Sequence, residues 1–282
     1  MDKSISHSYN QANAGKRMFA MRTGATLAAL AMFAALTPAP AHAWNWNWSF
    51  GNTTKGSGNF VTVDRVALNF NEVKVALSSD VTVKQGNSEG VTIEADDNIA
   101  ADILVEVKGN ALHIRPKDKD TNYKSARKII ITVNVKDLQK ISVAGDTNTT
   151  IGALKTKNLS ASVAGSGNLN VQQLIADELK ISLAGSAASK AAGTVQNLNV
   201  SIAGSGSIDA PMLQALTAKL SIAGSGSATI WAKDKLNISV AGSGTVRYLG
   251  NPEVKQSVAG SANVSRLADS TSAAYSAGDA NK

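Results

Sequence analysis

The residues that could carry acid–base or nucleophilic chemistry are sparse in this chain. The sequence holds three histidines and no cysteine, which excludes disulfides, thiolate catalysis and cysteine-based metal sites. His113 stands between Leu112 and Ile114, so alternation on a strand would point its ring away from these apolar neighbours and into solvent. The other two histidines, His7 and His42, lie in the N-terminal segment that we expect to be removed, so a serine hydrolase would depend on His113. No nucleophile elbow accompanies it. The sequence therefore predicts no serine triad.

Carboxylates are the second group with catalytic potential, because glycosidases work with paired acids. Asp177 and Glu178 are adjacent, and on a strand their side chains would diverge. The segment 96–98 is Asp-Asp-Asn, which lacks the ligand spacing of a known calcium loop and favours a plain turn over a metal site. The stretch 96–101 is expected as a short helical turn or a loop. We therefore expect no catalytic residue, no metal ligand and no cofactor. Folding could still gather distant acids, so a polysaccharide-active β-helix enzyme is the alternative.

Two sets of regularly spaced side chains could bind a ligand. Three tryptophans alternate with asparagine, which would place the indoles on one side of a strand, either to stack on sugars or to cap one end of the fold. A row of outward serines could meet a repeating polymer, or could simply keep a stacked surface soluble. The candidate binding face comprises Trp44, Trp46, Trp48, Ser162, Ser182, Ser201, Ser221 and Ser239.

These serines belong to a phrase that occurs seven times: Ser, an aliphatic residue, Ala and Gly, usually followed by Ser. Successive glycines are 20, 20, 19, 20, 18 and 18 residues apart, a period typical of stacked structural units. Positions two, four and six before each glycine are nearly all apolar, so they would share the inner side of a strand. Tight corners are predicted at Gly145, Gly165, Gly185, Gly204, Gly224, Gly242 and Gly260.

These patterns predict an all-β fold. Residues 136–267 should form a right-handed parallel β-helix, or β-solenoid, with coils of about 18–20 residues that hold two or three short strands each. Residues 60–135 alternate with period two but lack the repeat, which predicts a more irregular strand region in front of the solenoid, with a surface loop at 117–128. A segment rich in tryptophan and glycine occupies 44–59, and a disordered polar tail is expected at 268–282.

The first 43 residues indicate a secretory signal peptide. Basic residues at 16–22 precede an apolar stretch at 24–36 that is too short to span a bilayer. Cleavage is expected between Ala43 and Trp44, after a small-x-small motif, with an uncleaved anchor as the alternative. Either form would place the protein outside the cytoplasm, in the periplasm or on the outer surface of a Gram-negative bacterium.

The charge balance bears on possible partners. The formal net charge is +7, and the signal segment contributes +3 (four basic residues and one acid), which leaves +4. Such a charge suits acidic glycans or a membrane surface. Nucleic acid is not expected, because no basic run interleaves with aromatic residues. The expected partners are envelope glycans or surface proteins, together with self-association through open solenoid ends.

A family resemblance is carried by the Ala-Gly-Ser-Gly repeats and by three stretches in front of them, 70–86, 91–98 and 109–114. Together they resemble the head GIN domain family, described as heads of autotransporter adhesins, over roughly 60–267. The resemblance implies a β-helix-like solenoid in a bacterial envelope protein. The family's description adds an adhesin-like role. Export, the repeats and the lack of a catalytic constellation predict a non-enzymatic envelope or surface protein, with a structural envelope module as a further alternative.

Overall fold

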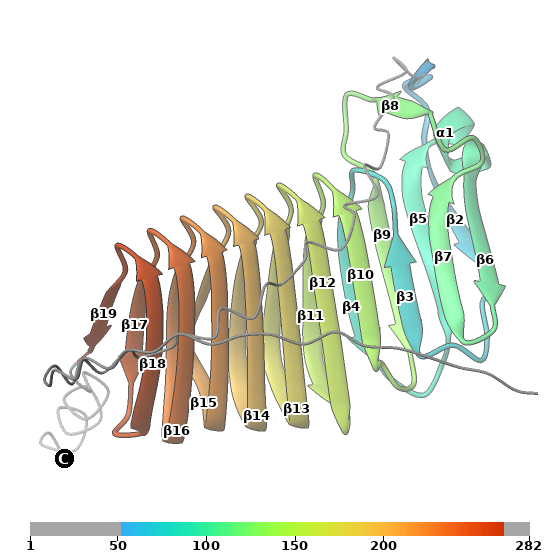
Figure 1. The fold of residues 1–282 in the computed structure, drawn as a ribbon. Helices are drawn as coiled ribbons and strands as arrows, with labels where there is room; N and C mark the ends of the chain where they lie inside the picture. The colour runs from blue at the N-terminus through green and yellow to red at the C-terminus, as the bar shows by residue number, and fades with distance from the viewer. Residues whose placement is uncertain (1–51, 268–282) are drawn as a thin grey trace, which may run out of the picture. The chain divides into compact units, whose positions relative to one another are not determined.

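A computed structural model describes residues 52–267, which all belong to one compact unit made almost entirely of β-strands (Figure 1). The predicted signal peptide with its cleavage site, the tryptophans of the candidate binding face and the tail at 268–282 lie outside the described residues. Within 52–267 the one helix is α1 (Asp97–Asp102), and it is neither long nor apolar enough to cross a membrane.

The N-terminal region holds nine strands. They are β1 (Thr53–Lys55), β2 (Phe60–Arg65), β3 (Glu72–Val75), β4 (Asp80–Gln85), β5 (Gly90–Asp96), β6 (Ile103–Lys108), β7 (Ala111–Pro116), β8 (Asn122–Lys124) and β9 (Ile130–Val135). Antiparallel pairs β2–β5, β5–β9 and β6–β7 occur here beside parallel ones, so this region is less regular than the repeats that follow. The short strands β1 and β8 pair with each other in a separate sheet.

The repeat region forms the remaining strands. They are β10 (Lys140–Gly145), β11 (Asn148–Lys155), β12 (Asn158–Gly165), β13 (Asn168–Gly185), β14 (Ala188–Gly204), β15 (Ser207–Gly224), β16 (Ser227–Gly242), β17 (Thr245–Leu249), β18 (Glu253–Gly260) and β19 (Asn263–Arg266). All pairings among them are parallel. Register shifts interrupt the pairs β13–β14, β14–β15 and β15–β16, and they lie between the two regular halves of each long strand.

The register of the ladders confirms the stacked coils. Each predicted corner glycine is the Cα partner of the corner glycine one coil later, from Gly145 with Gly165 to Gly242 with Gly260. Like residues therefore form columns along the solenoid axis, about 4.8 Å apart. The predicted β-solenoid, and the irregular strand region in front of it, are confirmed.

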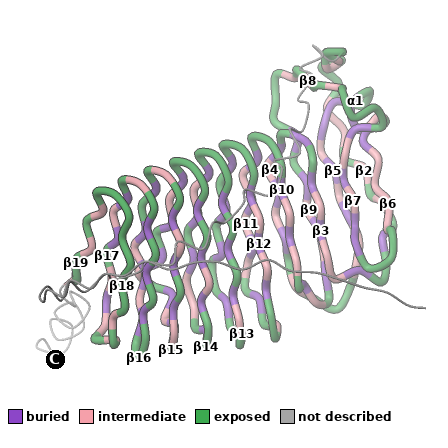
Figure 2. Tube along the Cα trace, viewed as in Figure 1, coloured by how far each residue is buried: buried purple, intermediate pink, exposed green. Residues whose placement is uncertain are grey.

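The core lies inside the coils. Leu159, Ala161 and Val163 occupy the positions six, four and two before one corner glycine, and each is at most 2 % exposed. Figure 2 shows this alternation of buried and outward residues on coil after coil. Full burial of one aliphatic side chain contributes about 1.5–3 kcal/mol, whereas ordering one residue costs about 1–2 kcal/mol of backbone entropy. A coil is therefore stable only against its neighbours.

Two expectations need correction, and one open alternative is decided. The segment at 117–128 is not all loop, because β8 pairs with β1 there. Of the short helical turn or loop expected at 96–101, the helical turn is found as α1, which follows directly after Asp96 at the end of β5. In the last coil the inward position Val258 is 41 % exposed, since β18 has a neighbouring coil on only one side within the described residues.

Candidate functional site

His113 is half-buried on β7, whereas the sequence suggested an exposed side chain. It stacks beside Lys74 of β3, which in turn stacks beside Ser142 of the first repeat. Burial lowers the pKa of His113, and the nearby charges of Lys74 and Lys108 lower it further. A catalytic histidine is normally oriented by a carboxylate that accepts a hydrogen bond from its ring. The ring of His113 makes no hydrogen bond within residues 52–267, so the arrangement is not that of a triad.

The adjacent acids Asp177 and Glu178 diverge. Asp177 accepts a hydrogen bond from Gln196 Nε2 (3.0 Å). Glu178 accepts one from Asn199 Nδ2 (2.9 Å) and forms an ion pair with Lys180 (3.1 Å). Each carboxylate is thus held by neighbours on its own side of the strand. The pair cannot act together on one substrate bond.

The acids near α1 hold the N-terminal region together. The buried Asp96 accepts hydrogen bonds from the Gly58 N–H (2.8 Å) and from the Ser125 hydroxyl. The pKa of Asp97 is lowered by hydrogen bonds from the side chains of Ser57 and Asn59 and then from the Asn98 N–H. These contacts join segments far apart in sequence. Within the described part of the chain, no three His, Asp or Glu side chains gather as a metal site would require.

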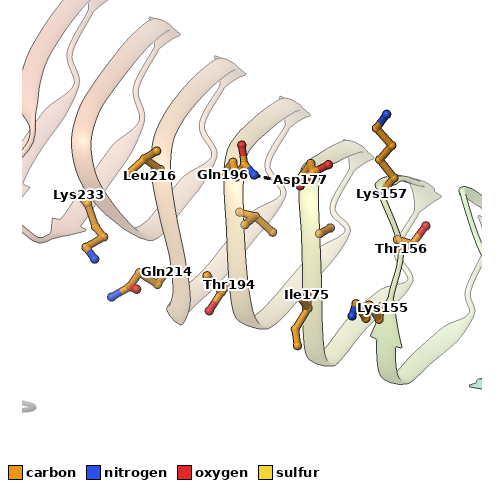
Figure 3. Close-up of a pocket in the computed structure, with 12 residues that line it drawn as sticks. Lys155, Thr156, Lys157, Ile175, Asp177, Thr194, Gln196, Gln214, Leu216 and Lys233 are labelled. Carbon is orange, nitrogen blue, oxygen red and sulfur yellow. Dashed lines mark hydrogen bonds between the residues drawn. The ribbon is translucent and has the colours of Figure 1, made fainter.

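A groove with a volume of about 780 Å³, which we call the lateral groove, lies on the side of the solenoid (Figure 3). It extends from the end of β11, across β13 and β14, to β15 and β16. Its lining consists of Lys155, Thr156, Lys157, Ile175, Ala176, Asp177, Thr194, Val195, Gln196, Gln214, Leu216 and Lys233. The groove therefore crosses several successive coils, which suits a long ligand better than a small one.

Parallel pairing builds one wall of the lateral groove. Lys155 is the partner of Ile175, Ile175 of Thr194, and Thr194 of Gln214, so the four side chains form a column along the axis. Ile175 is 53 % exposed there, and Leu216 elsewhere in the lining is 43 % exposed. The lining of the groove thus combines apolar surface with amide, hydroxyl and ammonium groups.

The lining of the lateral groove holds three lysines and one carboxylate. Lys155 and Lys157 lie at one end and Lys233 at the other (Figure 3). Asp177 is the one carboxylate in the lining, and its hydrogen bond to Gln196 is drawn in the same view. Glycosidases of the usual kind need two carboxylates across the scissile bond. The lining supplies one.

Sequence reasoning did not find the lateral groove. Ile175 and Leu216 lie where the long strands change register, so their exposure does not follow from the offsets that identify the core. The only signal was the break in alternation near these positions. Such a break does not say on which side a hollow will form.

The five serines of the candidate face that the structure describes stand in one column. Ser162 pairs with Ser182, Ser182 with Ser201, Ser201 with Ser221, and Ser221 with Ser239. Three of them are exposed, whereas Ser162 and Ser221 are half-buried. Shallow hollows of about 430 and 370 Å³ lie over this column and the alanines beside it. A binding role for the serines stays a prediction.

Comparison with known proteins places this architecture in a family. A family model described as "Putative auto-transporter adhesin, head GIN domain" matches residues 69–252, well over half of the chain. The chain belongs to the head GIN family. The search of curated proteins found no match.

Solved structures share the head GIN fold. A "putative adhesin" from Bacteroides fragilis is 28% identical with a TM-score of 0.72, over 76% of this chain and 100% of its own. A "Putative lipid binding protein" from Parabacteroides distasonis is 25% identical with a TM-score of 0.64, over 77% and 100%. A "putative adhesin" from Parabacteroides merdae, 23% identical with a TM-score of 0.59 over 77% and 100%, shares the fold. None of these names denotes an enzyme.

Proposed function

We propose that this head GIN protein is a non-enzymatic, exported envelope protein that binds an extended glycan along the lateral groove, as an adhesin would. The observation that carries the proposal is the direction of the groove. One wall is a column of side chains contributed by successive coils, so an elongated ligand can lie along the axis and contact one coil after another.

The chemistry of the lateral groove supports a glycan as the ligand. The side chains of Gln196, Gln214 and Thr194 offer both donors and acceptors, which suit sugar hydroxyls. Ile175 and Leu216 offer apolar surface that suits the C–H faces of sugar rings. The single carboxylate, Asp177, argues for binding without cleavage. Two structural neighbours are named as adhesins, which agrees with this role.

A matched pair of substitutions tests the groove. Ile175→Asp adds a charge within the lining, and Met212→Asp adds the same charge at a side chain that is 73 % exposed and outside the lining. Binding of the purified protein to an array of immobilised envelope glycans should weaken about ten-fold for Ile175→Asp, because the apolar surface at this position is lost and a bound ligand would have to desolvate the added carboxylate. Met212→Asp should bind like the wild type.

Three results would contradict the groove proposal. The wild type could bind no glycan, both variants could bind equally well, or the protein could cleave a polysaccharide. Preferential binding to phospholipid vesicles over glycans would point to a lipid ligand, the activity for which one structural neighbour is named.

Export is tested separately. Cells that express the full chain are divided into cytoplasm, periplasm, outer membrane and medium, and the protein is detected by immunoblot. The proposal expects it outside the cytoplasm, shortened at its N-terminus by cleavage after Ala43. Recovery of the intact chain in the cytoplasm alone would refute an envelope role.

A further inference from the structure

A row of lysines runs along a second side of the solenoid. Five residues before each corner glycine stands an outward residue, and in every second coil this residue is lysine. The column reads Lys140, Ser160, Lys180, Asn199, Lys219, Asn237 and Lys255. Each member is the Cα partner of the next, so the column is continuous. We call Lys140, Lys180, Lys219 and Lys255 the lysine row.

The spacing of the lysine row follows from strand geometry. Parallel strands are about 4.8 Å apart, so lysines two coils apart are separated by about 9.6 Å. This is close to the length of one disaccharide in an extended glycan. The neutral residues between them, Ser160, Asn199 and Asn237, carry groups that hydrogen-bond to uncharged sugars.

The surface beside the lysine row is suited to a chain lying flat. On one side of the lysine row lies the serine column of the repeated phrase, whose side chains are small. On the other side lies a column of larger polar and charged residues, Asn158, Glu178, Asn197, Thr217, Lys235 and Glu253, so the flat surface is on the serine side. A hollow of about 250 Å³ lies between Lys180, Lys219 and these serines. This hollow is distinct from the lateral groove, because the two share no lining residue.

The charge of the lysine row is only partly neutralised. Lys180 and Lys255 form ion pairs with Glu178 (3.1 Å) and Glu253 (3.3 Å), and their side chains are 55 % and 75 % exposed. Exposed pairs of this kind contribute about 0–1 kcal/mol, so an anionic ligand can replace the glutamates. Lys219 is exposed and makes no ion pair within residues 52–267.

We propose that the lysine row binds an anionic polysaccharide that carries one carboxylate or sulfate in each disaccharide and lies parallel to the solenoid axis. The proposal rests on the proposed function in one respect, that the protein meets glycans outside the cytoplasm. It concerns a separate surface and a defined charge spacing. Avoidance of like-charge stacking would also separate the lysines, but that explanation predicts no binding.

The first test changes the charge. The quadruple substitution of the lysine row to glutamine should weaken binding of hyaluronan oligosaccharides, which carry one carboxylate per disaccharide. The expected loss is about ten-fold or more, because the ion pairs between the four lysines and the carboxylates of the ligand are lost. A matched control replaces four exposed lysines elsewhere with glutamine and should bind like the wild type. These lysines are Lys84, Lys119, Lys124 and Lys190. Both variants lose the same net charge.

The second test changes the spacing and keeps the composition. The double substitution Lys180→Asn with Asn199→Lys moves one charge by a single coil and brings it next to Lys219. Binding of hyaluronan should weaken, and circular dichroism should show an unchanged fold, since both positions face outward. Unchanged binding would overturn the claim that spacing matters.

The outcomes separate this proposal from the lateral groove. Loss of hyaluronan binding on Ile175→Asp alone, with the lysine row dispensable, would overturn the lysine-row proposal and favour the groove. Equal binding of neutral chitin oligosaccharides, or a preference for anionic vesicles over hyaluronan, would also overturn it. Loss of hyaluronan binding only in the lysine-row variants, together with wild-type binding that weakens as salt is added, would support it, because salt screens exposed charges.

Discussion

At the residue scale, the corner glycines meet two separate demands. All seven have positive φ, a conformation that disfavours side chains. Six of them also face the corner of the preceding coil. A Cβ on Gly165 would lie 2.7 Å from the carbonyl oxygen of Gly145, and one on Gly204 would lie 2.6 Å from that of Gly185. Gly145 differs, because the nearest atom to its Cβ would be Ser78 Oγ at 3.8 Å.

This difference gives a prediction. Gly145→Ala should lower the free energy of unfolding by about 1 kcal/mol, because only the backbone conformation is strained. Gly204→Ala should lower it by about 3 kcal/mol, because the added methyl group also forces two coils apart. Equilibrium urea unfolding, followed by circular dichroism, measures both. The two φ values are close, +106° and +113°, so an equal loss would mean that corner stacking adds nothing.

At the element scale, most strands could be predicted from the sequence, whereas the register shifts within the long strands and the short elements near the N-terminus could not. Within the strand region expected at 60–135, the stretches that alternate at 80–84, 103–108 and 129–135 agree with β4, β6 and β9 within a residue or two, because alternation of β-branched residues is a local signal. The serine column was predictable for the same reason, since a strict period fixes its register. Ile175 and Leu216 were not, because register shifts within the long strands decide which side they face.

The missed strands β1 and β8, and the choice of a helical turn over a loop at α1, depend on contacts between distant segments. Asp96 joins Gly58 to Ser125, and the Tyr123 hydroxyl donates a hydrogen bond to Asp102 (2.8 Å). Burial and this hydrogen bond raise the pKa of Tyr123, so the hydroxyl stays protonated as a donor. Such long-range pairings leave no pattern in a single sequence. They nevertheless determine whether the polar segment at 117–128 is ordered.

Asp96→Ala should therefore loosen this segment before the solenoid. The buried carboxylate accepts two hydrogen bonds, and its loss leaves their donors unpaired, at a cost of about 1–3 kcal/mol. Tryptic cleavage at the lysines and arginine of 117–128 should accelerate about ten-fold as local opening becomes easier. Asp64→Ala is the control, because exposed Asp64 accepts a single hydrogen bond, from Thr92 Oγ1 (2.7 Å). Similar cleavage of the two variants would show that Asp96 does not hold the segment.

At the scale of the whole molecule, the solenoid is a sum of similar coils that stabilise one another. Contacts run from each coil to its neighbours, so stability should depend on the number of coils more than on any single one. The columns impose a condition, however. A change in length is compatible with the fold only if it preserves the stacking of corner on corner.

Removal of one complete coil tests this condition. Deletion of residues 205–224 joins Gly204 to Ser225, so that the coil ending at Gly242 can stack directly on the coil ending at Gly204. The shortened protein should keep its β-sheet circular dichroism and melt cooperatively, about 5 °C lower, because one coil interface is lost. Deletion of 205–214 is the control. It leaves about half a coil, and so few residues cannot travel round the core from one corner to the next. This variant should aggregate or unfold. Equal tolerance of the two deletions would mean that stability does not depend on the corner columns.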